Sequence, residues 1–274
     1  MLWLLQTNFF REAGYARLIE TLSRLSLPYV VVKPVPFTQR LVRADVDTSR
    51  ARVDVDELPD VELDAQQPIV TMGSYTLARM AAARGYRPGA WLDGLDYTTW
   101  SKAWQPSQLL NPNARVCRFG DADFDDEVAF VRPVEDSKAF AGKVFERGEW
   151  RGWKRRVLDS AQPGDPLTVD TEVLIAQPVS IFTETRCWVV DRSIVTVSGY
   201  KRGKHVVYTP GADDEVVAFA QQCIEEWVPN NAFVLDVAQT PAGCKVVEVN
   251  CLNAAGFYAA DVLKLVSAIE TRFG

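Results

Sequence analysis

The segment spanning residues 232–256, AFVLDVAQTPAGCKVVEVNCLNAAG, constrains the fold of this chain more than any other part of the sequence. Two runs rich in Val and Leu flank QTPAGC, a turn that contains Pro and Gly, so the segment predicts a β-hairpin. A register symmetric about Ala242 places Asp236 directly opposite Glu248, with Asn250 two residues further along on the same face. The predicted hairpin therefore gathers three polar side chains on one face.

The same register sorts the remaining hairpin residues. The opposite face carries only apolar side chains suited to a core, namely Phe233, Leu235, Val237, Val247 and Val249, while Val234, Ala238 and Val246 complete the polar face. Carboxylates that face each other across a sheet repel, and a hard divalent cation would remove that repulsion. We therefore predict a magnesium site at Asp236, Glu248 and Asn250. The alternative is that this acidic face is the solvated side of the hairpin.

The composition is that of an ordinary globular protein without a broad basic surface. A chain of 274 residues is long enough for a large core and for two or three lobes. Hydrophobic residues make up 47% of the chain and charged residues 24%, which excludes a disordered chain. A formal net charge of −6 argues against nucleic-acid binding, so an anionic ligand must meet a local cluster of Lys and Arg.

The usage of cysteine and histidine narrows the chemistry further. The five cysteines are dispersed without a Cys-x-x-Cys pair, which indicates reduced thiols rather than disulfides or a zinc site. His205 is the only histidine, so neither a multi-histidine metal site nor histidine-based catalysis is expected. The N-terminus lacks the features of a signal peptide, and no apolar run approaches transmembrane length. We therefore expect a cytoplasmic protein that is not attached to a membrane.

Strand and helix patterns alternate over residues 1–95, which favours a small open α/β domain. Within it, PIVTMGSYTLARMAAARGYRPGAW predicts a strand, a turn at Gly73 and Ser74, and a helix. Ser74 is a candidate N-cap, and the amides of a helix N-terminus there could hold an anion, although a plain helix start is the alternative. Residues 38–67 are polar and acidic, and we expect loops or edge structure there.

Residues 96–274 predict a second, larger unit. LDYTTWSKAW indicates a helix, DEVAFVRPVEDSKAFAGKVFERGEW a strand, a loop and a strand, and DTEVLIAQPVSI another strand. A hairpin follows that turns at Asp191 and Arg192, then a helix over 213–227, the hairpin described first, and a last helix over about 258–273. The fold class is thus α/β (or α+β), with two predicted domains.

Two sets of charged side chains accompany these strands. The first lies in or beside the loop after FVRP, where backbone amides could also approach a phosphate, and comprises Arg132, Lys138 and Lys143. In the second set, Glu184 and Arg186 share a strand face, and Lys201 lies just past the end of the partner strand. Each basic group alone is typical of a solvated surface. Together with a carboxylate-bound metal, they supply the charge neutralisation that a triphosphate requires.

The order of these motifs resembles the ATP-grasp superfamily over residues 95–274. The matching pieces are FVRPVEDSKAFAG, IAQPV, ETRCWVV, FVLDVA and VEVNCLNAAG. The resemblance implies two lobes that close on a nucleotide, preceded by a smaller α/β domain. It also implies ATP binding by Arg132, Lys138, Lys143, Glu184, Arg186 and Lys201, with adenine at the hinge residues Ala176, Gln177 and Val179. Magnesium, or manganese in its place, would be bound by the three hairpin residues.

Two departures from the common pattern are informative. Arg132 stands where many relatives have Lys, and Lys138 lies further on in the loop. This resembles an ATP-grasp clade distinguished by such a relocation of Arg and Lys. NCLNAAG also lacks the Ser-Pro-Gly found in many peptide-ligase relatives, which bears on the specificity for the acceptor and not on nucleotide binding.

The resemblance implies an ATP-dependent carboxylate–amine ligase with an acyl-phosphate intermediate. Arg186 and Lys138 would serve catalysis by alignment and charge neutralisation, with no protein nucleophile. The partners would be ATP, a small carboxylate, and an amine or peptide acceptor. We expect Gly73, Ser74 and Asn253 to border the substrate pocket, although helix caps and loop asparagines commonly serve only structure. Two alternatives stay open: a nucleotide-binding regulatory or interaction module, and a small-molecule kinase of the same fold.

Overall fold

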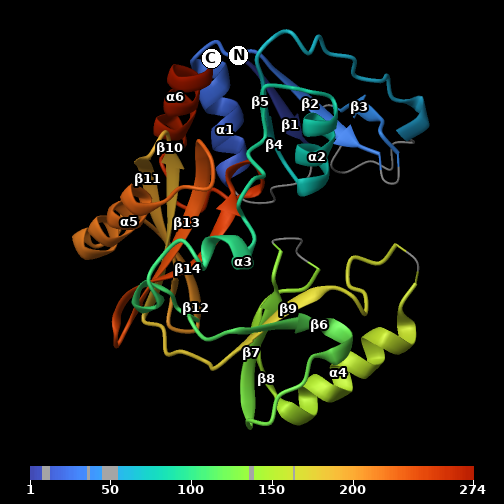
Figure 1. The fold of residues 1–274 in the computed structure, drawn as a ribbon. Helices are drawn as coiled ribbons and strands as arrows, with labels where there is room; N and C mark the ends of the chain where they lie inside the picture. Colours follow the sequence, from blue (N-terminus) through green and yellow to red (C-terminus); the bar gives the residue numbers. More distant parts are fainter. Residues whose placement is uncertain (8–12, 36–37, 45–54, 136–138, 163) are drawn as a thin grey trace.

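The computed structural model describes residues 1–7, 13–35, 38–44, 55–135, 139–162 and 164–274. It confirms a mixed α/β fold, built from three sheets and the helices that cover them (Figure 1). Lys138 lies outside the described residues. No helix within the described ranges is long and apolar enough to cross a membrane.

The N-terminal sheet has five strands in the order β3-β2-β1-β4-β5. These strands are β1 (Leu2–Gln6), β2 (Tyr29–Pro34), β3 (Leu41–Arg43), β4 (Ile69–Met72) and β5 (Pro88–Gly89). The central strand β1 pairs in parallel with β2 and β4, and helices α1 (Ala13–Arg24) and α2 (Tyr75–Ala83) follow β1 and β4 in the chain. Parallel strands buried on both faces have continuous apolar runs, which is why LWLL and PYVVV are recognisable as strands. The short β3 pairs antiparallel at the edge, within the polar span that predicts loops or edge structure.

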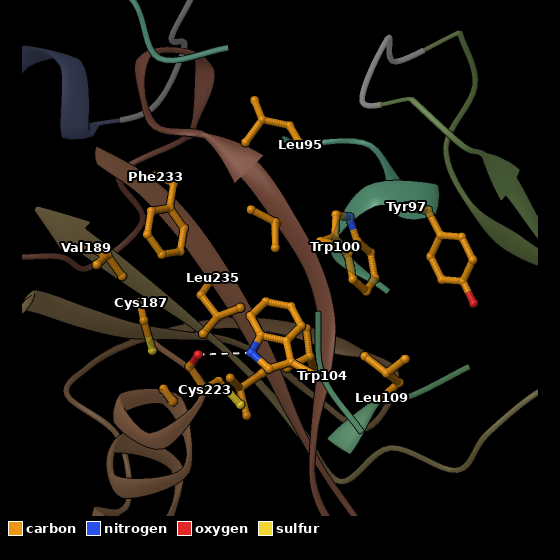
Figure 2. Close-up of a cluster of buried hydrophobic side chains, with 14 of the residues drawn as sticks. Leu95, Tyr97, Trp100, Trp104, Leu109, Cys187, Val189, Cys223, Phe233 and Leu235 are labelled. Carbon is orange, nitrogen blue, oxygen red and sulfur yellow. Dashed lines mark hydrogen bonds between the residues drawn. The ribbon is translucent and has the colours of Figure 1, made fainter. Parts of the chain in front are cut away.

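The second sheet is antiparallel, in the order β12-β11-β10-β13-β14. Its strands are β10 (Thr183–Val190), β11 (Ser193–Arg202), β12 (His205–Pro210), β13 (Ala232–Thr240) and β14 (Gly243–Cys251). The turn between β10 and β11 falls at Asp191 and Arg192, as predicted, and both residues have the positive φ that a tight hairpin turn requires. Helix α5 (Asp214–Glu226) packs against this sheet in the core drawn in Figure 2, where the Trp104 indole donates a hydrogen bond to the carbonyl of Cys223.

The predicted C-terminal hairpin is β13–β14, but its register contains an irregularity. Pairs near the turn are centred between Pro241 and Ala242, as in Thr240 opposite Gly243, whereas Asp236 lies opposite Glu248 as expected. The difference is one extra residue in β14, a β-bulge that includes Val247. The predicted core face is therefore wrong at this point, because the bulge buries Val246 and leaves Val247 only partly buried.

The third sheet has four antiparallel strands in the order β6-β9-β7-β8. These are β6 (Arg115–Arg118), β7 (Val128–Pro133), β8 (Lys143–Glu146) and β9 (Glu172–Ala176), and they form a separate lobe with helix α4 (Arg147–Ser160) (Figure 1). The sequence pattern does not predict α4, because its charged residues hide a narrow apolar stripe. Trp150 is that stripe's fully buried residue, and its indole donates a hydrogen bond to the Ala122 carbonyl.

The C-terminal helix α6 (Val262–Phe273) packs beside α1, between the first two sheets (Figure 1). One apolar cluster joins both sheets and both helices, with Trp3, Leu18, Trp188 and Leu265 among its members. A short helix, α3 (Tyr97–Trp100), follows the N-terminal sheet and lies beside β14. The last helix therefore packs on the N-terminal unit although it follows the larger unit in sequence. The division into residues 1–95 and 96–274 stays a prediction.

Candidate functional site

Three polar side chains of the β13–β14 hairpin converge on one face of the second sheet. The Asn250 amide nitrogen lies 3.2 Å from Asp236 Oδ2 and 2.9 Å from Glu248 Oε1. Asp236 has no exposed surface, whereas Asn250 retains 6%. The bulge in β14 makes this possible, because without the extra residue Asp236 would face Val247 in place of Glu248.

Arg186 of β10 joins this cluster from the neighbouring strand. It lies directly opposite Asp236 in the register, and its guanidinium donates two hydrogen bonds to that carboxylate, Nε to Oδ1 at 2.9 Å and Nη2 to Oδ2 at 2.8 Å. The guanidinium carbon lies 4.8 Å from the ring centroid of Tyr258 and 5.6 Å from that of Tyr200. A planar, doubly bonded and ring-covered guanidinium is held in one orientation.

Arg132 reaches the same cluster from the third sheet. Its Nη1 lies 3.3 Å from Glu248 Oε2, and its guanidinium lies over Tyr97 and Trp100 of α3, at 5.9 and 5.8 Å from the ring centroids. Arg132 belongs to β7, so this contact joins the lobe of the third sheet to the sheet that carries the carboxylates. The two arginines therefore approach one pair of carboxylates from two lobes.

Glu184 lies on the strand face of Arg186, two residues earlier. It opposes Lys201 across the ladder, and its carboxylate accepts hydrogen bonds from the Lys201 ammonium at 2.5 Å and the Tyr200 hydroxyl at 2.6 Å. Both contacts arise because β11 is irregular there, so Tyr200 and Lys201 together face one residue. Glu184 is thereby neutralised and fixed beside the main cluster.

The two carboxyl groups of the hairpin differ in acidity. Burial raises the pKa of Asp236 to about 7, although the adjacent Arg186 acts in the opposite direction. Burial also acts to raise the pKa of Glu248, but Arg132 and the amide of Asn250 outweigh it, so this pKa is lowered. A further positive charge between the two groups would favour the ionised form of both.

The donor set of the hairpin fits a hard divalent cation. Two carboxylates and one amide carbonyl supply oxygen ligands of the kind that Mg²⁺ and Mn²⁺ prefer. Asn250 presents its nitrogen to the carboxylates here, and rotation of the amide by half a turn would present its oxygen. Among the described residues, no group of three His, Cys, Asp or Glu side chains forms a metal site elsewhere. Asp236, Glu248 and Asn250 are therefore the residues that would hold the metal.

The other predicted nucleotide residues lie at varying places. Lys143 belongs to β8, where its ammonium pairs with Glu149 at 2.7 Å. Of the expected hinge, Ala176 ends β9, Gln177 hydrogen-bonds to Asp126, and Val179 is exposed. These residues lie on the segment between the third sheet and the second, which is the place of a hinge between lobes. Their roles in binding ATP stay predictions.

Asn253 is bound by backbone groups of the N-terminal unit. Its amide nitrogen donates to the carbonyl oxygen of Thr71 at 2.7 Å and that of Gly89 at 3.3 Å, and its Oδ1 accepts from the Trp91 amide at 3.0 Å. The side chain has no exposed surface. In this structure Asn253 therefore ties the end of the hairpin to β4 and β5.

Gly73 and Ser74 also make contacts between segments. The Gly73 amide donates to the Asn253 carbonyl at 2.8 Å, and a Cβ on Gly73 would lie 2.6 Å from the Cβ of Gln6. The Ser74 hydroxyl caps α2 by accepting from the Leu77 amide and also donates to the Gln6 side chain at 2.7 Å. The predicted helix start is confirmed, and the substrate role of these two residues stays a prediction.

Sequence reasoning missed the aromatic side chains around the arginines. Tyr258 stacks on Tyr200, with ring centroids 5.3 Å apart, and on Tyr208, 4.9 Å apart. Its φ of 48° is left-handed, which is uncommon for a tyrosine and is found most often at functional sites. The only signal in the sequence is the presence of tyrosines close to the polar strands, and that pattern alone is not specific.

The geometry agrees with comparisons to known proteins. A family model for an ATP-grasp domain, family 3 of the Arg-to-Lys clade, matches residues 47–269. Comparison with curated protein sequences finds no significant match.

Solved structures share the fold over almost the whole chain. D-cycloserine synthetase DcsG is 14% identical with a TM-score of 0.59, and the match covers 99% of each chain. A RimK domain protein ATP-grasp from Sphaerobacter thermophilus is 15% identical with a TM-score of 0.58, covering 98% of this chain and 94% of that one. D-alanine–D-alanine ligase from Bacillus anthracis complexed with ATP is 13% identical with a TM-score of 0.56, covering 98% and 96%. At these identities the similarity establishes the fold alone.

Proposed function

We propose an enzymatic role from one premise: this chain belongs to family 3 of the Arg-to-Lys clade of ATP-grasp domains. Our proposal is an ATP-dependent ligase that joins the carboxylate of an amino acid or peptide to an amine, with release of ADP and phosphate. Two neighbours of the same fold carry the names of a synthetase and a ligase, and one of them was solved with ATP. Both facts support a reaction driven by ATP.

One observation carries the proposal. Asp236, Glu248 and Asn250 converge within hydrogen-bonding distance, and Arg186 and Arg132 reach the two carboxylates from different lobes. Alternating acidic and basic groups of this kind suit a metal-bound triphosphate, because the metal takes the carboxylates and frees the guanidinium groups for phosphate oxygens. A degenerate regulatory copy would be free to lose any one of these side chains.

The chain's own residues would act by orientation and charge. Arg186 is held by two hydrogen bonds and the ring of Tyr258, so little reorganisation is needed when it meets a phosphate oxygen. Arg132 would neutralise a second oxygen from the opposite lobe, and closure of the two lobes would exclude water. Mg²⁺, held by Asp236, Glu248 and Asn250, would withdraw charge from the phosphate oxygens. Lys138 lies outside the described residues, and its catalytic role rests on the resemblance alone.

The proposed reaction has two steps, both between substrates. The substrate carboxylate oxygen attacks the γ-phosphorus of ATP, the bond to the β–γ bridging oxygen breaks, and ADP leaves. The amine then attacks the acyl carbon, phosphate leaves with its oxygen, and the amine loses one proton. No step needs a covalent bond to the protein, which agrees with the lack of a histidine-based nucleophile.

Product analysis tests this proposal. The enzyme is incubated with Mg²⁺ and ATP, together with amino acids and peptides offered singly and in pairs, and ADP, phosphate and coupled product are measured. Ligation predicts ADP release that needs both co-substrates and equals the coupled product. A phosphorylated single substrate would instead assign a kinase, and ATP binding without turnover on any pair would assign a regulatory module.

A further inference from the structure

A cavity of about 250 Å³ lies between helix α2 and the segment that connects the N-terminal sheet to α3. Arg79 contributes from α2, Asp96 from the connecting segment, and Glu135 from the residues just after β7. Tyr75, Leu92 and Leu95 supply the less polar part of the wall. The cavity therefore has contributions from the N-terminal unit and from the lobe of the third sheet, and carries charges of both signs.

The charged groups of this cavity are not used within the fold. Neither Arg79 nor Glu135 forms a hydrogen bond or an ion pair with any other described residue, although charged surface groups commonly find partners. Asp96 caps α3 through Oδ1, which accepts from the Thr98 hydroxyl and the Thr99 amide, and leaves Oδ2 without a partner in the part of the chain that the structure describes. One guanidinium and two carboxylate groups thus remain available to a ligand.

The cavity also adjoins the candidate phosphate site. Tyr75 accepts a hydrogen bond through its hydroxyl from the amide of Cys251, the residue after Asn250. Asp96 directly precedes Tyr97, whose ring faces the Arg132 guanidinium, and Glu135 follows the strand that carries Arg132. Both carboxylates are therefore on segments next to Arg132, whereas Arg79 is on the N-terminal unit.

The size and charge of the cavity select a class of ligand. Pockets for drug-sized molecules measure roughly 300–1,000 Å³, so a cavity of this volume suits a smaller molecule. A guanidinium binds a carboxylate through two parallel hydrogen bonds, and carboxylate groups bind an ammonium. A small zwitterion satisfies both ends of the cavity, whereas a phosphate or a dicarboxylate would meet repulsion from Asp96 and Glu135.

We propose that this cavity binds the α-carboxylate and α-ammonium groups of a free amino acid, with the carboxylate on Arg79 and the ammonium on Asp96 and Glu135. In this orientation the amine end lies toward Arg132, so the amino acid is the amine partner of the ligation. This assignment of a role rests on the proposed function, whereas the binding itself does not.

Equilibrium binding tests the site without ATP or metal. The full chain is titrated calorimetrically with each proteinogenic L-amino acid and with D-alanine. At least one amino acid is expected to bind, and its amide and its N-acetyl derivative should each bind roughly 10–100-fold more weakly, since each lacks one charge-assisted contact. Absence of binding by every free amino acid, or binding of both derivatives as tight as that of the free amino acid, would overturn the proposal.

Variants assign the contacts to residues. Arg79→Ala and Glu135→Gln should each weaken binding of the same amino acid by roughly 10–100-fold, because each removes one charged partner. Arg155→Ala on α4 is the matched control, since Arg155 is also an exposed helical arginine but lies outside the cavity. Alanine is favourable in a helix, so Arg79→Ala should keep its melting temperature. Unchanged binding by Arg79→Ala would contradict the assignment.

Turnover separates this inference from the proposed function. In a ligation assay, Arg79→Ala should raise KM for the amino acid and leave KM for ATP unchanged. Amino-acid binding without any ADP release would retain the cavity and reject the ligase, whereas ADP release that depends on a pair of co-substrates, with no free amino acid bound, would do the reverse.

Discussion

Asn250 and Asn253 stand three residues apart at the end of the same hairpin, and both are buried, yet the partners of their side chains differ in kind. The Asn250 amide donates to ionisable side chains, the carboxylates of Asp236 and Glu248. The Asn253 side chain contacts backbone amide and carbonyl groups of the N-terminal unit through both its oxygen and its nitrogen.

This difference distinguishes a residue held for the fold from one available to a ligand. Backbone partners cannot change charge or leave without unfolding their sheet, so Asn253 has a structural role with a high penalty for loss. The carboxylate partners of Asn250 are paired with arginines and can exchange those partners for a cation. The type of hydrogen-bond partner therefore says more about function than burial or proximity in sequence does.

The largest expected effect is the loss of turnover in Glu248→Gln. The substitution keeps the shape of the side chain but removes a charge that would bind the metal, so we expect ATP turnover to fall roughly 10²–10³-fold or more. Circular dichroism and the melting temperature should remain near those of the wild type. Turnover at the wild-type rate in a folded variant would show that Glu248 is not a metal ligand.

Asn253→Ala should act on stability instead. It leaves the Trp91 amide and the Thr71 and Gly89 carbonyls without this partner, so we expect the free energy of unfolding to fall by about 2–4 kcal/mol. Asn250→Ala is the matched control and should change stability much less while it impairs turnover. Equal destabilisation by the two variants, measured by urea unfolding, would remove the distinction between the two asparagines.

Arg186→Lys should have an intermediate effect on both properties. One ammonium cannot reproduce the two parallel hydrogen bonds to Asp236 or the planar contact with Tyr258, so we expect a roughly 10–100-fold loss of turnover and a lower melting temperature. Arg272→Lys, in an exposed pair with Asp191, is the control and should change stability by at most about 1 kcal/mol. A neutral Arg186→Lys substitution would mean that Arg186 has no orienting role.

The smallest effect concerns pH. Since the pKa of Asp236 is raised to about 7, the metal-free folded protein holds a proton that the unfolded chain has released. This proton contributes stability that is present below the ordinary pKa of an aspartate and is lost as pH rises through about 7. Asp236→Asn cannot titrate, so its unfolding free energy should change less between pH 5 and pH 8. Parallel pH profiles for both proteins would contradict the raised pKa.

The sequence predicts the parts of the site that depend on local pattern. Apolar alternation and a Pro/Gly turn are enough for the β13–β14 hairpin and for the pairing of Asp236 with Glu248. The bulge at Val247 could not be predicted, because the turn and the polar pair imply registers that differ by one residue. The core face is therefore misassigned between Val246 and Val247, although the polar pair itself is confirmed.

Contacts between distant segments are beyond sequence reasoning. The packing of α6 on α1 joins the two ends of the chain, and no periodicity in either helix specifies its partner. The contacts of the Asn253 side chain likewise depend on residues 162–182 positions earlier, in β4, β5 and the segment after them. Charge masks the apolar stripe of α4, whose buried Trp150 is one residue in a predominantly basic helix.

The central claim is that Asp236, Glu248 and Asn250 form the metal site of a bound nucleotide. Titration of the protein with Mn²⁺ in the presence of ATP, followed by electron paramagnetic resonance, measures this directly, because bound and free Mn²⁺ give different signals. We predict saturable Mn²⁺ binding by the wild type and by the surface control Arg272→Lys, with roughly tenfold or more weaker binding by Glu248→Gln. Wild-type Mn²⁺ affinity in Glu248→Gln would contradict the account.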